Sequence, residues 1–63
     1  MPAMLPSEPM RSALAAIGIS PEKHERRTLR SLIHEKTGAP PPDHRTADEL
    51  ARMLLDIEKK ERK

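Results

Sequence analysis

Residues 38–46 read GAPPPDHRT, and this stretch decides how the chain can fold. Three successive prolines favour the extended polyproline II conformation, and each disfavours helix at the residue before it. Thr46 and Glu49 have the spacing of a capping box, in which the threonine oxygen accepts from the amide of residue 49 and the glutamate reaches back. The stretch therefore predicts a helix that stops at Gly38, a stiff connector, and another helix that begins at Ala47.

Helix signals on both sides of this connector predict three helices and no strand. Apolar residues at helical spacing favour a first helix over about residues 10–17, ended by Gly18. Ser20 followed by a proline is typical of a helix start, so a second helix is expected over about residues 21–37. The third is expected over about residues 47–60. The pattern predicts a small all-α three-helix domain, with the proline-rich connector between the second and third helices.

Composition limits the size and the class of this protein. The 63 residues can form one small domain, which we place at residues 10–63 after a flexible arm over residues 1–9. The chain has no cysteine and no aromatic residue, so leucine, isoleucine, methionine and alanine must form the core. No apolar run approaches the ~20 residues of a membrane span, and the first residues do not resemble a secretory signal. We therefore expect an intracellular, cytoplasmic protein without a membrane partner.

A basic stripe is expected on one face of the second helix. Lys23, Arg27, Arg30 and His34 are spaced so that they share a helical face, and Arg26 flanks them. Each Lys or Arg can displace counterions from a nucleic-acid backbone. The same stripe would suit an acidic protein surface, and a solvated polar face is the third interpretation. The small net charge of +2 counts against the nucleic-acid interpretation.

The third helix has an unusually wide apolar face. Its apolar positions spread over an arc of roughly 200° at about 100° per residue, and we expect Leu50, Met53, Leu54 and Ile57 to form the core. If the other two helices pack on both flanks, they use the whole arc. Otherwise a strip near Met53, Leu55 and Ile57 is left for a protein partner or for a second copy of the chain.

Catalysis and metal binding are poorly supported by the residue types present. His24, His34 and His44 do not have the three- or four-residue spacing that puts two ligands on one helical face. Without cysteine, a structural zinc site is not expected. A three-helix chain of this size also has little room for a cleft that shifts pKa values. We expect no enzyme activity, no cofactor, no metal and no small-molecule substrate.

Residues 28–55 resemble the SAP and related helix-extended-loop-helix DNA-binding modules. The matching positions are Leu29, Leu32, Ile33 and Gly38 before the connector, and Glu49, Leu50, Leu54 and Leu55 after it. The resemblance implies that the connector sets the separation and angle of two helices, and that Arg45 contacts DNA. This chain differs from the family at Ala47 and Asp48, where a basic residue is common.

Two hypotheses of function follow from these patterns. The first is a non-catalytic nucleic-acid-binding or regulatory module that grips phosphates of duplex DNA, because stacking on single strands needs aromatic rings that this chain lacks. The alternative is a small protein-interaction module, such as an inhibitor, adaptor or docking domain, that uses the apolar face of the third helix and could be a homodimer. The predicted phosphate-binding residues are Lys23, Arg26, Arg27, Arg30, His34 and Arg45.

Overall fold

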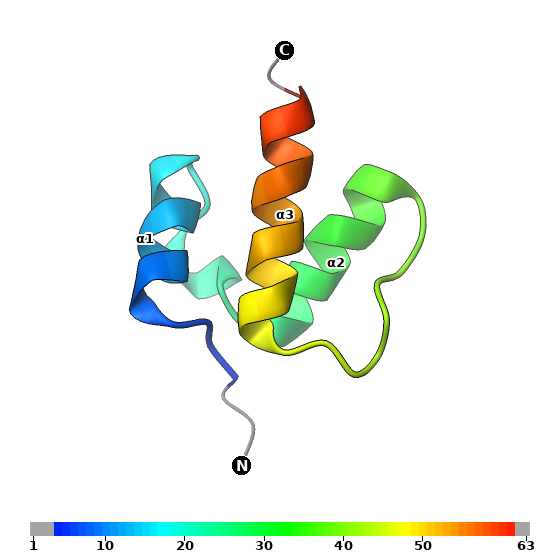
Figure 1. The fold of residues 1–63 in the computed structure, drawn as a ribbon, viewed down its shortest axis with the longest axis horizontal. Coiled ribbons are helices and arrows are strands. Elements are labelled where there is room, and N and C mark those ends of the chain that lie inside the picture. Colours follow the sequence, from blue (N-terminus) through cyan, green and yellow to red (C-terminus); the bar gives the residue numbers. More distant parts are fainter. Residues whose placement is uncertain (1–3, 62–63) are drawn as a thin grey trace.

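The computed structural model describes residues 4–61, and these form three α-helices and one 3-10 turn without any strand. This confirms the predicted all-α domain with the proline-containing connector between its second and third helices (Figure 1). The first three residues of the expected arm and the last two of the expected domain lie outside the described range. The elements are α1 (Glu8–Ala16), η1 (Pro21–Lys23), α2 (Arg26–Thr37) and α3 (Ala47–Glu61).

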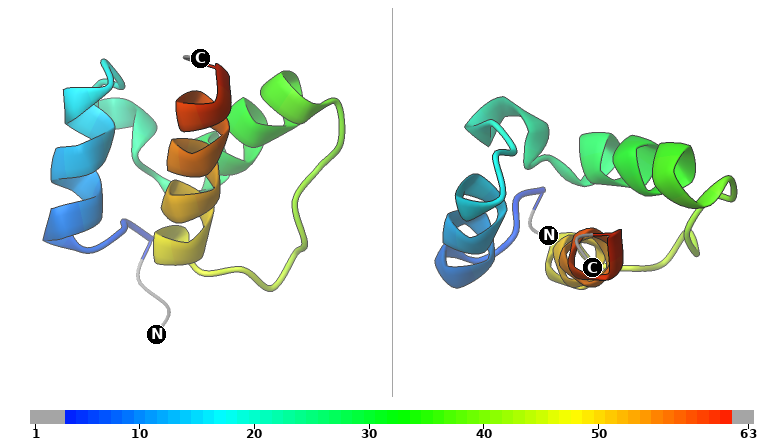
Figure 2. Two further views of the ribbon diagram at one scale, coloured as in Figure 1. Left: turned by 45° about the horizontal axis from the view of Figure 1, so that its top comes forward. Right: turned by 90° about the horizontal axis from the view of Figure 1, so that it is seen from above.

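Helix α3 is the central element of the fold. Figures 1 and 2 show it between α1 and α2, and it packs against both of them. The spacing of its buried residues puts them on one stripe, and burying each leucine or isoleucine contributes about 1.5–3 kcal/mol. The core is built without aromatic rings from Leu14 of α1, Leu29 and Ile33 of α2, and Leu50, Ala51 and Leu54 of α3.

The second helix begins five residues later than the sequence predicts. The serine-proline signal starts only the 3-10 turn η1, and Ser20 forms no side-chain cap there. His24 then turns inward, is 3% exposed, and its Nε2 lies 3.0 Å from the carbonyl oxygen of Ile19. In a continuous helix His24 would lie about 140° around the axis from buried Leu29 and would face away from the core. His24 can be buried because the helix is interrupted between η1 and α2, which begins at Arg26.

The N-terminal segment, residues 4–7, is tied to the start of both later helices. The amide of Arg26 donates to the carbonyl oxygen of Met4 at 2.9 Å, and the amide of Ser7 donates to the Asp48 carboxylate. Pro6 is buried. The arm expected over residues 1–9 is therefore too long, since α1 already begins at Glu8 and the four residues before it are held in place.

The connector begins and ends where its sequence predicts. Gly38 has φ of +79°, in the left-handed region that favours glycine, and its amide donates to the carbonyl oxygen of His34 at 2.8 Å. At the other end, the Glu49 amide donates to Thr46 Oγ1 at 3.2 Å, as in the predicted capping box. Pro41 is buried although its neighbours are exposed, so the connector is packed against the domain.

The far ends of α2 and α3 are joined by ion pairs. Lys36 pairs with Glu58 and, at 3.3 Å, with Glu61. Hydrogen bonding to Glu58 is the main cause that raises the pKa of Lys36, and the Glu61 contacts act in the same direction. Within residues 4–61 no helix combines the length and apolar character that a membrane span requires.

Candidate functional site

An open groove with a volume of 1110 Å³ lies between the N-terminal segment, α2, the connector and the first residues of α3. Its apolar lining comes from Met4 and Leu5 of the N-terminal segment and from Pro40 and Pro41 of the connector. Its polar lining is dominated by basic residues: Arg26, Arg27, Arg30, His34, His44 and Arg45. Segments that are far apart in the sequence thus form one concave site.

Five of the six predicted phosphate-binding residues meet in this groove, and Lys23 does not. Lys23 belongs to η1 and not to α2, and buried His24 follows it. It lines a smaller hollow of 570 Å³ together with Thr28, Leu32 and His34, and His34 lines the groove as well. The predicted stripe on one helix is therefore wrong at its first member, because the helix had been extended through the turn.

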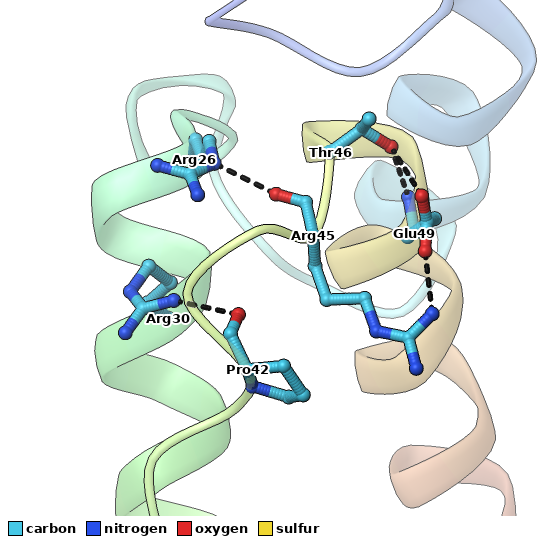
Figure 3. A network of polar contacts seen from close by, with 6 residues as sticks. All are labelled: Arg26, Arg30, Pro42, Arg45, Thr46 and Glu49. Atoms are coloured by element: carbon cyan, nitrogen blue, oxygen red, sulfur yellow. Dashed lines mark hydrogen bonds and ion pairs between the residues drawn. The ribbon is translucent and has the colours of Figure 1, made fainter.

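Arg26 binds the connector rather than standing free in solvent. Its Nε donates to the carbonyl oxygen of Arg45 at 2.8 Å, and its Nη2 donates to the carbonyl oxygen of Asp43 (Figure 3 shows the first contact). Carbonyls of a connector outside helices and sheets have no regular backbone partner, so a side-chain donor satisfies them. Both acceptors are neutral, so the positive charge of Arg26 is not balanced by a carboxylate.

Arg30 makes the next contact along the same segment. Its Nη1 donates to the carbonyl oxygen of Pro42 at 2.9 Å (Figure 3), and its Nη2 forms an ion pair with Asp43 Oδ1 at 2.8 Å. The Arg30 side chain is 24% exposed and the Asp43 side chain 96%. Two arginines that the sequence suggested for phosphate binding therefore hold the proline connector against α2.

Arg45 and Arg27 differ in how their charge is balanced. Arg45 Nη1 lies 2.6 Å from Glu49 Oε2, and this hydrogen bond is the main cause that lowers the pKa of the Glu49 carboxyl. Hydrogen bonds from Thr46 lower the same pKa further. Arg27 is exposed, and it has no ion-pair partner among residues 4–61.

The net charge of the groove is small. Its four arginines face three carboxylates, which belong to Asp48 in the lining and to Asp43 and Glu49 beside it. One positive charge remains when the histidines are neutral. Of the groove arginines, Arg26 and Arg27 have no carboxylate partner in the described part of the chain, so the site is suited to a ligand with few negative charges.

Met4 and Leu5 are the groove residues that sequence reasoning missed. They are 67% and 41% exposed, and no other large apolar side chain within residues 4–61 is exposed to this degree. The sequence placed them in a proline-containing arm, and no local pattern showed that this arm returns to α2. Their place depends on the long-range hydrogen bond between the Met4 carbonyl and the Arg26 amide.

The apolar strip predicted on the third helix lies against the core. Met53, Leu55 and Ile57 are partly buried and pack against the central cluster. Because α1 and α2 flank α3 on both sides, they cover most of its wide apolar arc. Among residues 4–61, no group of three or more histidine, cysteine, aspartate or glutamate side chains is placed to hold a metal ion.

No protein-family model, no curated protein and no solved structure matches this chain. The resemblance of residues 28–55 to helix-extended-loop-helix modules therefore stays a prediction. The functional argument rests on the groove itself.

Proposed function

We propose that this chain is a non-catalytic binding module whose groove takes an acidic segment of a partner protein that also presents an apolar side chain. The observation that carries the proposal is the pairing of apolar walls with a small net positive charge in one concave site. Such a surface complements a peptide with one or two carboxylates beside an apolar residue.

Both the number of unpaired arginines in the groove and the hydrogen-bonding geometry of the guanidinium group support this partner. Among the groove arginines, Arg26 and Arg27 have no carboxylate partner within residues 4–61, and a guanidinium binds a carboxylate through two parallel hydrogen bonds. Arg26 is already oriented by the connector carbonyls, so less side-chain freedom is lost when a ligand binds it. A ligand with two carboxylates is sufficient to balance these two groups.

The apolar walls supply the second part of the recognition. Met4 and Leu5 are exposed at the groove, and covering apolar surface gains about 25 cal/mol per Å². Methionine adapts its shape to different partners, whereas the connector prolines in the lining are conformationally stiff. This combination favours an apolar anchor residue in the ligand over a purely charged one.

Duplex nucleic acid is the second candidate, because five of the six predicted phosphate-binding residues gather in the groove. Two unpaired arginines would give a slope of about −2 in a plot of log K against log salt concentration. If Arg30 and Arg45 left their carboxylates, four contacts would give about −4. Binders with strong salt dependence make about 6–10 phosphate contacts, so this groove is poorly equipped for a duplex.

Fluorescence anisotropy with labelled ligands tests the two candidates side by side. The probes are a short synthetic peptide with glutamates on both sides of one leucine, the same peptide with glutamine for glutamate, the same peptide with alanine for leucine, and a mixed-sequence DNA duplex. We expect the first peptide to bind, and each altered peptide to bind more weakly. Tight, steeply salt-dependent binding of the duplex alone would overturn the proposal in favour of nucleic acid.

Matched variants locate the binding site on the protein. Arg27→Gln should weaken binding of the acidic peptide, whereas Arg52→Gln makes the same change at an exposed position of α3 away from the groove. Leu5→Ser should weaken binding of the leucine-containing peptide more than binding of its alanine analogue. Equal effects of Arg27→Gln and Arg52→Gln would mean that net charge, and not the groove, attracts the peptide.

A further inference from the structure

The ion pair between Arg30 and Asp43 differs from the Arg45–Glu49 pair in its carboxylate side chain, which is far more exposed than that of Glu49. Arg30 points one nitrogen at the Pro42 carbonyl and the other at the Asp43 carboxylate, at 2.9 and 2.8 Å. The Asp43 side chain is 96% exposed, and this ion pair is its only contact with a charged group among residues 4–61. Arg30 itself lines the groove.

We propose that Asp43 occupies the position on Arg30 that a carboxylate of the ligand takes when the groove is filled, so that Asp43 is an internal competitor. This inference rests on the proposed binding of an acidic segment. It makes Arg30 a third arginine that reads the charge of the ligand, in addition to Arg26 and Arg27.

The geometry allows the Asp43 carboxylate to leave without disturbing the fold. The connector is held by backbone carbonyls: that of Asp43 accepts from Arg26, and that of Pro42 accepts from Arg30. Neither contact uses the Asp43 side chain. The Pro42 carbonyl also keeps the Arg30 guanidinium in place, so its second nitrogen remains available at the groove when the carboxylate rotates into solvent.

The expected size of the competition follows from the exposure of the pair. Exposed ion pairs favour the paired form by about one- to five-fold. If the ligand needs Arg30 unpaired, its apparent affinity is reduced by the fraction of molecules in which Arg30 is free. Removing the Asp43 carboxylate should therefore tighten binding of the acidic peptide about two- to six-fold.

A double-mutant cycle with the glutamate-leucine peptide tests the inference. Asp43→Asn keeps the backbone carbonyl and removes the charge, and it should tighten binding about two- to six-fold. Asp56→Asn, the matched control at an exposed position of α3, makes the same charge change away from the groove and should have little effect. In an Arg30→Gln background Asp43→Asn should no longer tighten binding, because its effect acts through Arg30.

Each outcome separates this inference from the proposed function. If wild-type protein binds the peptide and Asp43→Asn leaves the affinity unchanged, the competitor role is wrong and the binding function stands. If Asp43→Asn still tightens binding in the Arg30→Gln background, the charge of Asp43 acts at a distance and the competitor role is again wrong. If neither wild type nor Asp43→Asn binds, both proposals fall. Circular dichroism is recorded on the Arg30→Gln protein to check that it is still helical.

Discussion

Substituting Arg26 by glutamine should destabilise the domain, because Arg26 holds the connector to α2. The change removes the donor to the Arg45 carbonyl, at 2.8 Å, and the donor to the Asp43 carbonyl. Hydrogen bonds to charged groups contribute about 1.5–3 kcal/mol each when buried. Because these contacts are exposed and water can replace them, we expect a total loss of about 1–2 kcal/mol. The backbone hydrogen bond from the Arg26 amide to Met4 is retained.

Its neighbour Arg27 supplies the control. Arg27→Gln is the same substitution one residue along the same helix, at an exposed side chain without an ion-pair partner in the described part of the chain. We expect its stability to lie within about 0.5 kcal/mol of wild type.

Thermal and urea unfolding followed by circular dichroism at the helix band compare the two variants, since the chain has no aromatic reporter. For a domain of this size, 1 kcal/mol corresponds to a shift in Tm of about 4–8 °C. Arg26→Gln should therefore unfold at a clearly lower temperature than Arg27→Gln. If the two variants unfold together, Arg26 does not hold the connector and the assignment of separate roles to the two arginines fails.

Three further predictions concern the connector and α3. Gly38→Ala should lower the free energy of unfolding in urea by about 1 kcal/mol, because φ at this residue is +79°. Beyond the adjacent residues no atom lies within 4 Å of the added methyl group, so a variant of unchanged stability would contradict the role of the left-handed conformation. The lowered pKa of Glu49 means that its contribution to stability is present above its ordinary pKa of 4.5 and is lost as the pH falls through its lower folded value. Urea midpoints measured across that range should therefore decline less in Glu49→Gln than in wild type, and parallel curves would refute the contribution of this residue. Leu55→Glu should lower the unfolding free energy by about 1–3 kcal/mol, because this side chain is partly buried against the core. An unchanged stability together with a loss of self-association in light scattering would instead identify α3 as an interface.

The local signals in the sequence predicted the ends of the connector well. Gly38 and the Thr46–Glu49 capping box act within one helical turn, so their effect does not depend on the rest of the fold. The start of the second helix was predicted less well. The serine-proline signal at residues 20–21 does start a turn, but burial of His24 ends it after η1.

Most basic residues of the candidate site were predicted from the sequence, but the groups that they contact were not. Helical spacing placed Arg26, Arg27, Arg30 and His34 near one another, and the short connector brought Arg45 back to them. The partners of Arg26 and Arg30 are separated from them by 12–19 residues in the sequence, whereas Arg45 pairs with Glu49 four residues away. No periodicity or propensity carries that information, so free and occupied arginines look the same in the sequence.

The sequence by itself determined three helices, the ends of the segment between the last two, and two of the predicted core positions of α3, Leu50 and Leu54, because these depend on propensity, caps and periodicity over a few residues. Only the tertiary structure decided how the charged and apolar side chains are used. It turned His24 inward, bound Arg26 and Arg30 to connector carbonyls, and brought exposed Met4 and Leu5 beside them. These outcomes depend on which unpaired backbone groups and apolar surfaces meet when distant segments pack together, and that is settled in three dimensions.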